Sequence, residues 1–223
     1  MAAGVVCAAR RYLLHHAKPL LGLELAKIDR ATIATLLNQV ERESGAVSAN
    51  RFRATLSSCL NWCAREGLTD SNPAAFTNRR AEASRDRVLT DGEIRAIWNA
   101  LPASDYGDVV KLLILTGVRR AEISDLAWNE IDFERGLIVL PPARTKNGRE
   151  HLIPMSGPVR VILEARRQIH GRDLVFGIRG DVGNFAFSGP KRRLDEALTS
   201  TVEKEWVLHD LRRTVATGMA DRL

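Results

Sequence analysis

The most restrictive feature of this 223-residue sequence is the stretch DVVKLLILTG at residues 108–117. Its pattern predicts a helix that is apolar on nearly every side, whereas a surface helix carries a single apolar stripe. Such a helix is stable only when other elements surround it. We therefore expect residues 108–116 to lie at the centre of a hydrophobic core, and the rest of the chain must supply the surrounding elements.

Helix and strand patterns on both sides of this stretch can supply the surrounding elements. Before it, Thr90 and Glu93 have the spacing of a capping box at the start of a helix. Downstream, NEIDFERGLIVL predicts one hairpin and ARTKNGREHLIPM predicts another, with Asn147 and Gly148 at a two-residue tip. Helical patterns resume at 157–169, at 189–200 and from about 208. Helices, then a small antiparallel sheet, then helices indicate a mainly helical α+β fold.

The first third of the chain predicts a separate small helical bundle. Asp29 is a suitable N-cap for a helix with an apolar stripe, and a second helix is expected over 47–66, ended by Gly67. The segment TNRRAEASRDR at 77–87 is nearly devoid of apolar residues and reads as a linker. It is either a solvated connector or a basic strap along a nucleic-acid backbone. We expect a helical domain over 1–76, the linker over 77–87 and a second domain over 88–223.

Composition narrows the classes of partner. The chain has 33 Lys and Arg against 27 Asp and Glu, a net charge of +6, and residues 1–87 hold 13 basic against 8 acidic residues. That surplus is compatible with contacts to a phosphate backbone. No apolar run reaches 18 residues, so no membrane span is expected. The charges follow the short apolar start, which is the wrong order for a secretory signal, and the three cysteines form no paired framework. A cytoplasmic protein is expected.

Three short motifs carry the candidate chemistry. In TGVRRAEI, Arg119 falls near a helix start and Glu122 lies on the same face. In TKNG, Lys146 directly precedes the predicted hairpin tip, and in HDLRR, His209 and Arg212 share a helix face. Each motif alone has a plain structural interpretation: an ion pair, a solvated lysine, a surface contact.

Taken together, these cations suit a phosphodiester. Two guanidinium forks, an ammonium and an imidazole match the equatorial oxygens of a pentacoordinate phosphorane, which carry additional negative charge. The sequence shows no carboxylate cluster of metal-ligand character and no phosphate-binding loop of the Walker type. We therefore expect no metal and no other cofactor.

The same motifs resemble those of the tyrosine recombinases, the phage-integrase family. The family's first arginine box is similar to TGVRRAEI, its hairpin lysine to TKNGR and its His-x-x-Arg box to HDLRR, in that order along the chain. The resemblance is closest to integrases of temperate phages and genomic islands, bacterial or phage-encoded. It implies a two-domain clamp around a double-stranded DNA attachment site, a helical core-binding domain before the catalytic domain, and a tetramer on DNA.

The resemblance also implies roles for individual residues. Arg119 and Arg212 would hold the scissile phosphate, Lys146 would protonate the departing 5′ oxygen, and His209 would bind the phosphate or take the proton of the nucleophile. Glu122 would support the site without reacting. Ten further cations are candidate DNA contacts: Arg51, Arg53, Arg79, Arg80, Arg85, Arg87, Arg120, Arg144, Lys191 and Arg213.

One part of the family pattern has no match. The family's nucleophilic tyrosine follows the His-x-x-Arg box by some tens of residues, whereas 11 residues follow Arg212. The only tyrosines are Tyr12, in the first helical segment, and Tyr106, which we expect in a loop; neither has the family's context. We therefore expect a chain incomplete at its C-terminus, and at its N-terminus too, that binds DNA but does not cleave it alone.

Three other interpretations stay open from sequence alone. One is a non-catalytic DNA-binding protein of the same fold that occupies attachment sites. Another is an enzyme similar to type IB topoisomerases, although the stretch LNWCAREGLTDSNP at 60–73, which resembles the end of an integrase core-binding domain, disfavours it. The last is a helical protein with scattered basic residues.

Overall fold

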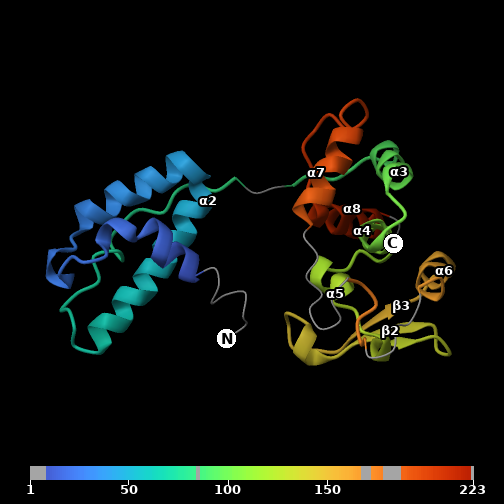
Figure 1. Ribbon diagram of the computed structural model, residues 1–223, viewed down its shortest axis with the longest axis horizontal. Coiled ribbons are helices and arrows are strands. Elements are labelled where there is room, and N and C mark those ends of the chain that lie inside the picture. Colours follow the sequence, from blue (N-terminus) through green and yellow to red (C-terminus); the bar gives the residue numbers. More distant parts are fainter. Residues whose placement is uncertain (1–8, 84–85, 167–171, 178–186, 222–223) are drawn as a thin grey trace. The chain divides into compact units, whose positions relative to one another are not determined.

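The computed structural model describes residues 9–83, 86–166, 172–177 and 187–221, and the chain forms two compact units, residues 1–84 and 85–223 (Figure 1). The predicted fold class is confirmed, because helices predominate and a small antiparallel sheet interrupts them. Arg85, one of the candidate DNA contacts, lies outside the described residues.

The first unit is built on one long, bent helix. After the short turns η1 (Tyr12–His16), η2 (Lys18–Leu20) and η3 (Leu25–Lys27), helix α2 spans Arg30–Arg65. Asp29 caps it by accepting the Thr32 N–H at 2.7 Å, and the chain changes direction at Gly45, whose φ is 80° (Figure 1). The two halves of α2 are the two predicted helices. No helix in the described parts of the chain is long and apolar enough to cross a membrane.

The segment after α2 returns along that helix. Asn50 donates its side-chain N–H to the Arg80 carbonyl at 2.9 Å and accepts the Arg80 N–H at 2.8 Å. The Asn72 amide donates to the Ser57 carbonyl at 3.0 Å. Residues 77–82, expected to be part of a linker, are thus fixed to the first unit up to Glu82, which also accepts from Asn50 at 2.7 Å.

The second unit alternates helices with a three-stranded meander. The strands pair in the order β1-β2-β3, all antiparallel, with Ile138 opposite both Ile131 and Ile153. Thr90 and Glu93 form the predicted capping box. The elements are α3 (Asp91–Ala100), α4 (Asp105–Thr116), α5 (Arg120–Ser124), η4 (Trp128–Glu130), β1 (Ile131–Asp132), β2 (Leu137–Leu140), η5 (Pro142–Arg144), β3 (His151–Pro154), α6 (Gly157–Glu164), α7 (Ser188–Ala197) and α8 (Leu208–Ala220).

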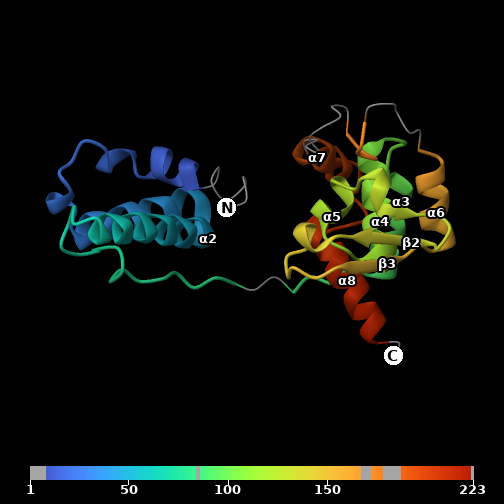
Figure 2. The ribbon, with the colours of Figure 1, turned by 90° about the horizontal axis from the view of Figure 1, so that it is seen from below.

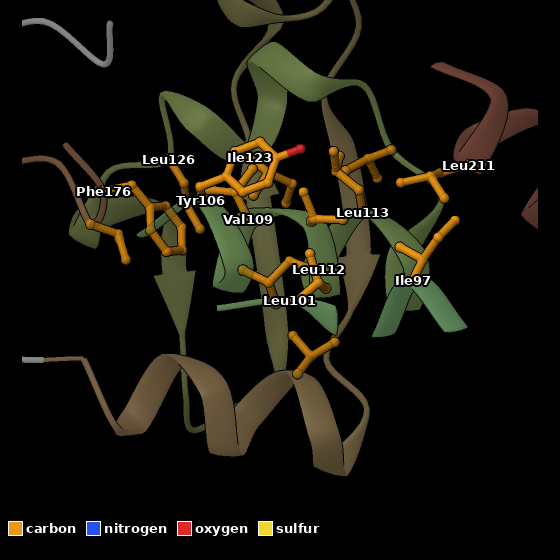
Figure 3. Close-up of a cluster of buried hydrophobic side chains, with 14 of the residues drawn as sticks. Ile97, Leu101, Tyr106, Val109, Leu112, Leu113, Ile123, Leu126, Phe176 and Leu211 are labelled. Carbon is orange, nitrogen blue, oxygen red and sulfur yellow. The ribbon is translucent and has the colours of Figure 1, made fainter. Parts of the chain in front are cut away.

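Helix α4 lies at the centre of this unit, as predicted. Val109 and Leu112 are completely buried, and α4 packs against α5, α6 and α8. Ile97 of α3 and Leu211 of α8 belong to the same cluster of side chains (Figure 3). Complete burial of such side chains contributes about 1.5–3 kcal/mol each. Beyond this core, the C-terminal end of α8 projects from the unit (Figure 2).

Two local expectations were wrong. Strands β2 and β3 do pair, but Leu140 lies opposite His151, so ten residues join them rather than a two-residue turn at Asn147 and Gly148. Pro141 and Pro142 follow β2 directly, and because proline has no N–H group they cannot continue the ladder. Tyr106 is not in a loop either: Ser104 caps α4, so Tyr106 lies in its first turn.

Candidate active site

Arg119 is fixed at the start of the short helix α5. Gly117 ends α4 in the left-handed conformation, with φ of 63°, and the chain turns into α5 two residues later. The Glu122 carboxylate accepts the Arg119 backbone N–H at 2.8 Å and its Nη1–H at 2.7 Å. The Arg119 side chain is 38% exposed. Nη1 of its guanidinium is therefore held by Glu122, while Nε and Nη2 have no partner among the described residues.

Glu122 is buried and ionised. Its burial works to raise its pKa, but the hydrogen bonds and charge of Arg119, together with the nearby His151, outweigh this and lower the pKa below its ordinary value of 4.5. A carboxylate that is ionised at neutral pH and already accepts two hydrogen bonds holds its arginine in place. It does not supply a proton.

Helix α8 places Arg212 beside this turn. Its Nη1 donates to the Gly117 carbonyl at 2.7 Å. The close approach of the two segments depends on Gly117, because a Cβ there would stand 2.6 Å from Cγ1 of Val215. His209, one helical turn before Arg212, is exposed, while Leu211 is buried on the other face, as predicted.

The start of α8 is anchored by Asp210. Its carboxylate is completely buried, and it accepts the Val207 N–H at 2.9 Å and Nη1–H of Arg213 at 2.8 Å. Together these bonds fix the first turn of α8, which carries His209. Sequence reasoning missed this anchor, because Asp210 lies inside the His-x-x-Arg motif and reads as one more polar residue.

Lys146 lies on the connection between β2 and β3. It is exposed, in a turn closed by the Gly148 N–H bonding to the Thr145 carbonyl at 3.2 Å. Two residues earlier, Arg144 Nη2 bonds to the carbonyls of Ala121 and Glu122 in α5, at 3.1 and 3.2 Å. Through these contacts the described structure brings the Lys146 turn against the helix that carries Arg119.

The candidate DNA contacts in the first unit are of two kinds: arginines bonded within the protein and arginines that are exposed. Arg53 donates to the Thr77 and Ala75 carbonyls, each at 2.9 Å. Arg80 is paired with Glu41 at 3.0 Å, and its side chain is only 11% exposed. These two arginines help to hold residues 75–80 against α2. Arg51 and Arg79 are exposed and have no hydrogen-bonding side-chain partner in the described parts of the chain.

The second unit uses most of its candidate cations internally. Arg87 pairs with Glu93, and Arg144 pairs with Glu130. Arg120 lies over the ring of Phe187 with its Cζ 4.7 Å from the centroid. Lys191 pairs with Asp195 and stands 4.0 Å from the Trp206 ring centroid.

Neither tyrosine is in contact with the four candidate catalytic residues, Arg119, Lys146, His209 and Arg212, in the described structure. Tyr12 lies in the first unit, in η1. Tyr106 is 4% exposed, its hydroxyl has no hydrogen-bond partner among the described residues, and burial raises its pKa. It stands ten residues before the end of α4, about 15 Å along the helix axis from the Gly117 turn. Within the described ranges, no group of three or more His, Cys, Asp or Glu side chains gathers to hold a metal ion.

Comparison with known proteins gives the arrangement a family. The profile described as the Phage integrase family matches residues 87–222, more than half of the chain. The shufflon-specific DNA recombinase of Escherichia coli is 28% identical over 198 residues, which cover 85% of this chain and 49% of that protein. Prophage integrase IntZ of Escherichia coli (strain K12) is 26% identical over 207 residues, covering 90% and 48%. The chain thus spans about half the length of these relatives.

Solved structures share the fold. A lambda integrase (75–356) dimer bound to a COC′ core site has a TM-score of 0.76 at 20% identity, over 100% of this chain and 85% of that one. A Tn1549 transposon integrase in complex with circular intermediate DNA has a TM-score of 0.72 at 16% identity, over 100% and 82%. By the family profile that covers most of its length, this chain belongs to the phage integrase family of tyrosine recombinases.

Proposed function

We propose that this chain binds duplex DNA and grips one backbone phosphate with Arg119, Lys146, His209 and Arg212, as part of a site-specific DNA recombinase. The observation that supports this most directly is the bond from Arg212 to the Gly117 carbonyl, at 2.7 Å, two residues before Arg119. Through this bond the guanidinium of Arg212, on α8, lies at the same turn between α4 and α5 that carries Arg119. Arginine pairs phosphate oxygens through parallel N–H groups, so two such forks at one turn suit a phosphodiester.

The proposed chemistry is transfer of a phosphodiester to a tyrosine. The phenol oxygen of a tyrosine other than Tyr12 and Tyr106 attacks phosphorus while His209 takes the phenol proton. The bond from phosphorus to the 5′ oxygen breaks, and the 5′ oxygen leaves with a proton from Lys146. The product is a 3′-phosphotyrosyl bond, which the 5′ hydroxyl of another strand attacks in the reverse sense, so no external energy source is consumed. Arg119 and Arg212 would each contribute roughly 100–1,000-fold in rate, as one oxyanion donor does elsewhere.

DNA binding is tested by the salt dependence of affinity. Fluorescence anisotropy with a labelled duplex, from 50 to 300 mM salt, should give a steep negative slope of log affinity against log salt, about 0.9 per phosphate contacted. Arg212→Ala should lower the slope by about 1. Arg119→Lys is used at the other position, because alanine there would leave buried Glu122 without its partner.

A matched control comes from the β1–β2 turn. Arg135 is an exposed arginine, 65% accessible, paired loosely with Asp132 at 3.8 Å. Arg135→Ala removes the same charge from the same unit and should leave the slope unchanged. Binding that is insensitive to salt, or an equal loss in Arg135→Ala and Arg212→Ala, would overturn the proposed phosphate grip.

The second candidate function is occupation of DNA sites without cleavage. It is favoured by the position of Tyr106, whose buried hydroxyl lies at the far end of α4 from the cations. The two functions are separated by incubating a labelled duplex with the product of the whole reading frame that contains this sequence. A protein–DNA adduct that survives denaturing electrophoresis supports recombination, whereas binding without an adduct supports occupation.

A further inference from the structure

The turn that carries Lys146 is attached to its unit through Arg144. The Arg144 guanidinium pairs with the Glu130 carboxylate through Nη1, while Nη2 donates to the carbonyls of Ala121 and Glu122 at 3.1 and 3.2 Å. A guanidinium is planar and its donors have a fixed geometry. Acceptors on two different segments, η4 and α5, therefore fix this side chain in more than one direction.

Glu130, the acidic partner, is itself held by the backbone. Its side chain is 7% exposed, and the oxygen that pairs with Arg144 also accepts the Ala127 N–H at 2.9 Å. The ion pair therefore ends on a folded segment and not on a mobile side chain. Both terminal nitrogens of Arg144, Nη1 and Nη2, are thus engaged with acceptors inside the protein.

The turn itself is closed from inside by Thr145. Its Oγ1 lies 2.6 Å from the Arg149 carbonyl and 3.1 Å from the Pro142 carbonyl, and the residue is 8% exposed. Lys146 follows immediately, and in the described structure its exposed side chain has no hydrogen bond or ion pair. The place of the ammonium group is therefore set by the backbone of the turn, and that backbone by Arg144 and Thr145.

Helix α5 connects this turn to the arginine of the site. The side chain of Glu122 holds Arg119, and the carbonyl of the same Glu122 accepts from Arg144. We propose that Arg144 is a positioning residue: by clamping the Lys146 turn to α5, it sets the distance of Lys146 from Arg119, and it does not itself bind DNA. This inference rests on the proposed function, which gives Lys146 its role as general acid.

The physical reason for such a clamp is the short reach of proton transfer. A general acid works only within about 2.6–3.2 Å of the oxygen it protonates, and a displacement of about 1 Å costs on the order of 100-fold in rate. A lysine on a ten-residue connection between β2 and β3 would not hold such a position without an anchor. Arg144 is the anchor that the described contacts provide.

The test compares Arg144→Ala with Arg149→Ala in the free protein. Both remove one positive charge next to Lys146, but the Arg149 side chain is exposed and makes none of these contacts. Backbone ¹⁵N order parameters at Lys146 and Gly148 should fall from about 0.85 to below about 0.6 in Arg144→Ala, a change from rigid to flexible backbone. Exchange of the Gly148 amide should become at least about 10-fold faster. Arg149→Ala should change neither.

A second variant keeps the test valid if Arg144→Ala folds poorly. Arg144→Lys retains the charge beside Glu130 but has no planar fork for two carbonyls, so we expect intermediate order at Gly148. Unchanged order in both variants would overturn the proposal. So would equally faster exchange at the core amide of Leu113 in α4, which would make Arg144 a general stabilising residue.

Failure of this proposal is distinguishable from failure of the proposed function. The order parameters need no DNA, so they report on the turn even if the chain binds no duplex. In the binding assay, Arg144→Ala should keep the salt slope of the unmodified chain. A slope lower by about 1 with an unchanged turn would show that Arg144 contacts phosphate directly, and would refute the positioning role.

Discussion

The contact between Gly117 and Val215 offers the sharpest test of how the site is assembled. Gly117 has φ of 63°, and a Cβ added to it would lie 2.6 Å from Cγ1 and 3.0 Å from Cβ of Val215. Gly117→Ala therefore combines two costs. A left-handed conformation costs a residue with a Cβ about 1–2 kcal/mol, and overpacking against α8 adds about 1–3 kcal/mol. The expected loss in the free energy of unfolding is about 2–5 kcal/mol.

A control separates the two costs. Gly136, in the β1–β2 turn, has φ of 65°, and its Cβ would meet nothing within 4 Å. Gly136→Ala should therefore lose only about 1–2 kcal/mol, the backbone part. Val215→Ala removes Cγ1, the methyl group that would stand 2.6 Å from the added Cβ, but keeps Cβ at 3.0 Å. Gly117→Ala should therefore be less costly in that background, and the double-mutant cycle measures the part of the steric cost that comes from Cγ1.

The assay is urea unfolding followed by fluorescence in a Trp62→Phe background. Trp62 is exposed in the first unit, and the other three tryptophans, at 98, 128 and 206, all lie in the second. Gly117→Ala should also weaken DNA binding, because the Gly117 carbonyl positions Arg212. The reasoning is refuted if Gly117→Ala and Gly136→Ala lose the same stability within about 0.5 kcal/mol, a difference too small for a steric clash.

Three further predictions concern single side chains. Because the pKa of Glu122 is lowered below 4.5, its ionised form stabilises the fold above that pH, and this contribution is lost as the pH falls through the lowered value. Glu122→Gln should flatten the acid side of a curve of unfolding free energy against pH; an unchanged curve would contradict the assignment. Arg80→Ala should lower the stability of the first unit by roughly 1–3 kcal/mol in urea unfolding and leave the DNA salt slope intact, whereas exposed Arg51→Ala should do the reverse. Tyr106→Phe removes a buried hydroxyl that lacks a partner among the described residues, so thermal unfolding should show equal or slightly higher stability; a marked loss would reveal a hydrogen bond to that hydroxyl.

Features governed by local rules could be predicted from the sequence. The all-round apolar pattern of residues 108–116 placed α4 in the core, and the caps at Asp29 and Thr90 marked two helix starts. Caps act within one turn and periodicity within one element, so neither depends on the rest of the fold. The order of the three motifs TGVRRAEI, TKNGR and HDLRR along the chain could likewise be read without knowledge of the fold.

The connection between β2 and β3 shows where local rules conflicted. Asn147-Gly148 is a strong signal for a two-residue hairpin, and it did form a turn. The strand pairing was decided elsewhere, because Pro141 and Pro142 ended β2 several residues earlier. Because Pro141 and Pro142 cannot donate to the β2–β3 ladder, the paired residues must lie before them, and the loop between the strands is correspondingly longer.

The roles of the basic residues depend on partners that are distant in sequence. Arg79 and Arg80 are neighbours of the same type, yet Arg79 is exposed while Arg80 pairs with Glu41, 39 residues away. The same holds for Arg144, whose partner Glu130 lies on another segment. Sequence composition gives the number of cations, but only the positions of the carboxylates show which of them are already neutralised inside the fold.

That distinction also explains why a net charge of +6 says little about where DNA would bind. An arginine held by an acid and by backbone carbonyls on every side adds to the charge count but has no donor left for a phosphate. Arg119 is different: Glu122 accepts from its Nη1, its Nε and Nη2 have no partner among the described residues, and its side chain is partly exposed. In such a phosphate site the Glu122 carboxylate orients the Arg119 guanidinium and leaves donors of that guanidinium available to a phosphate. Among the candidate DNA contacts, the salt slope of binding should therefore follow those with free donors, such as Arg51, Arg119 and Arg212, and not the total of basic residues.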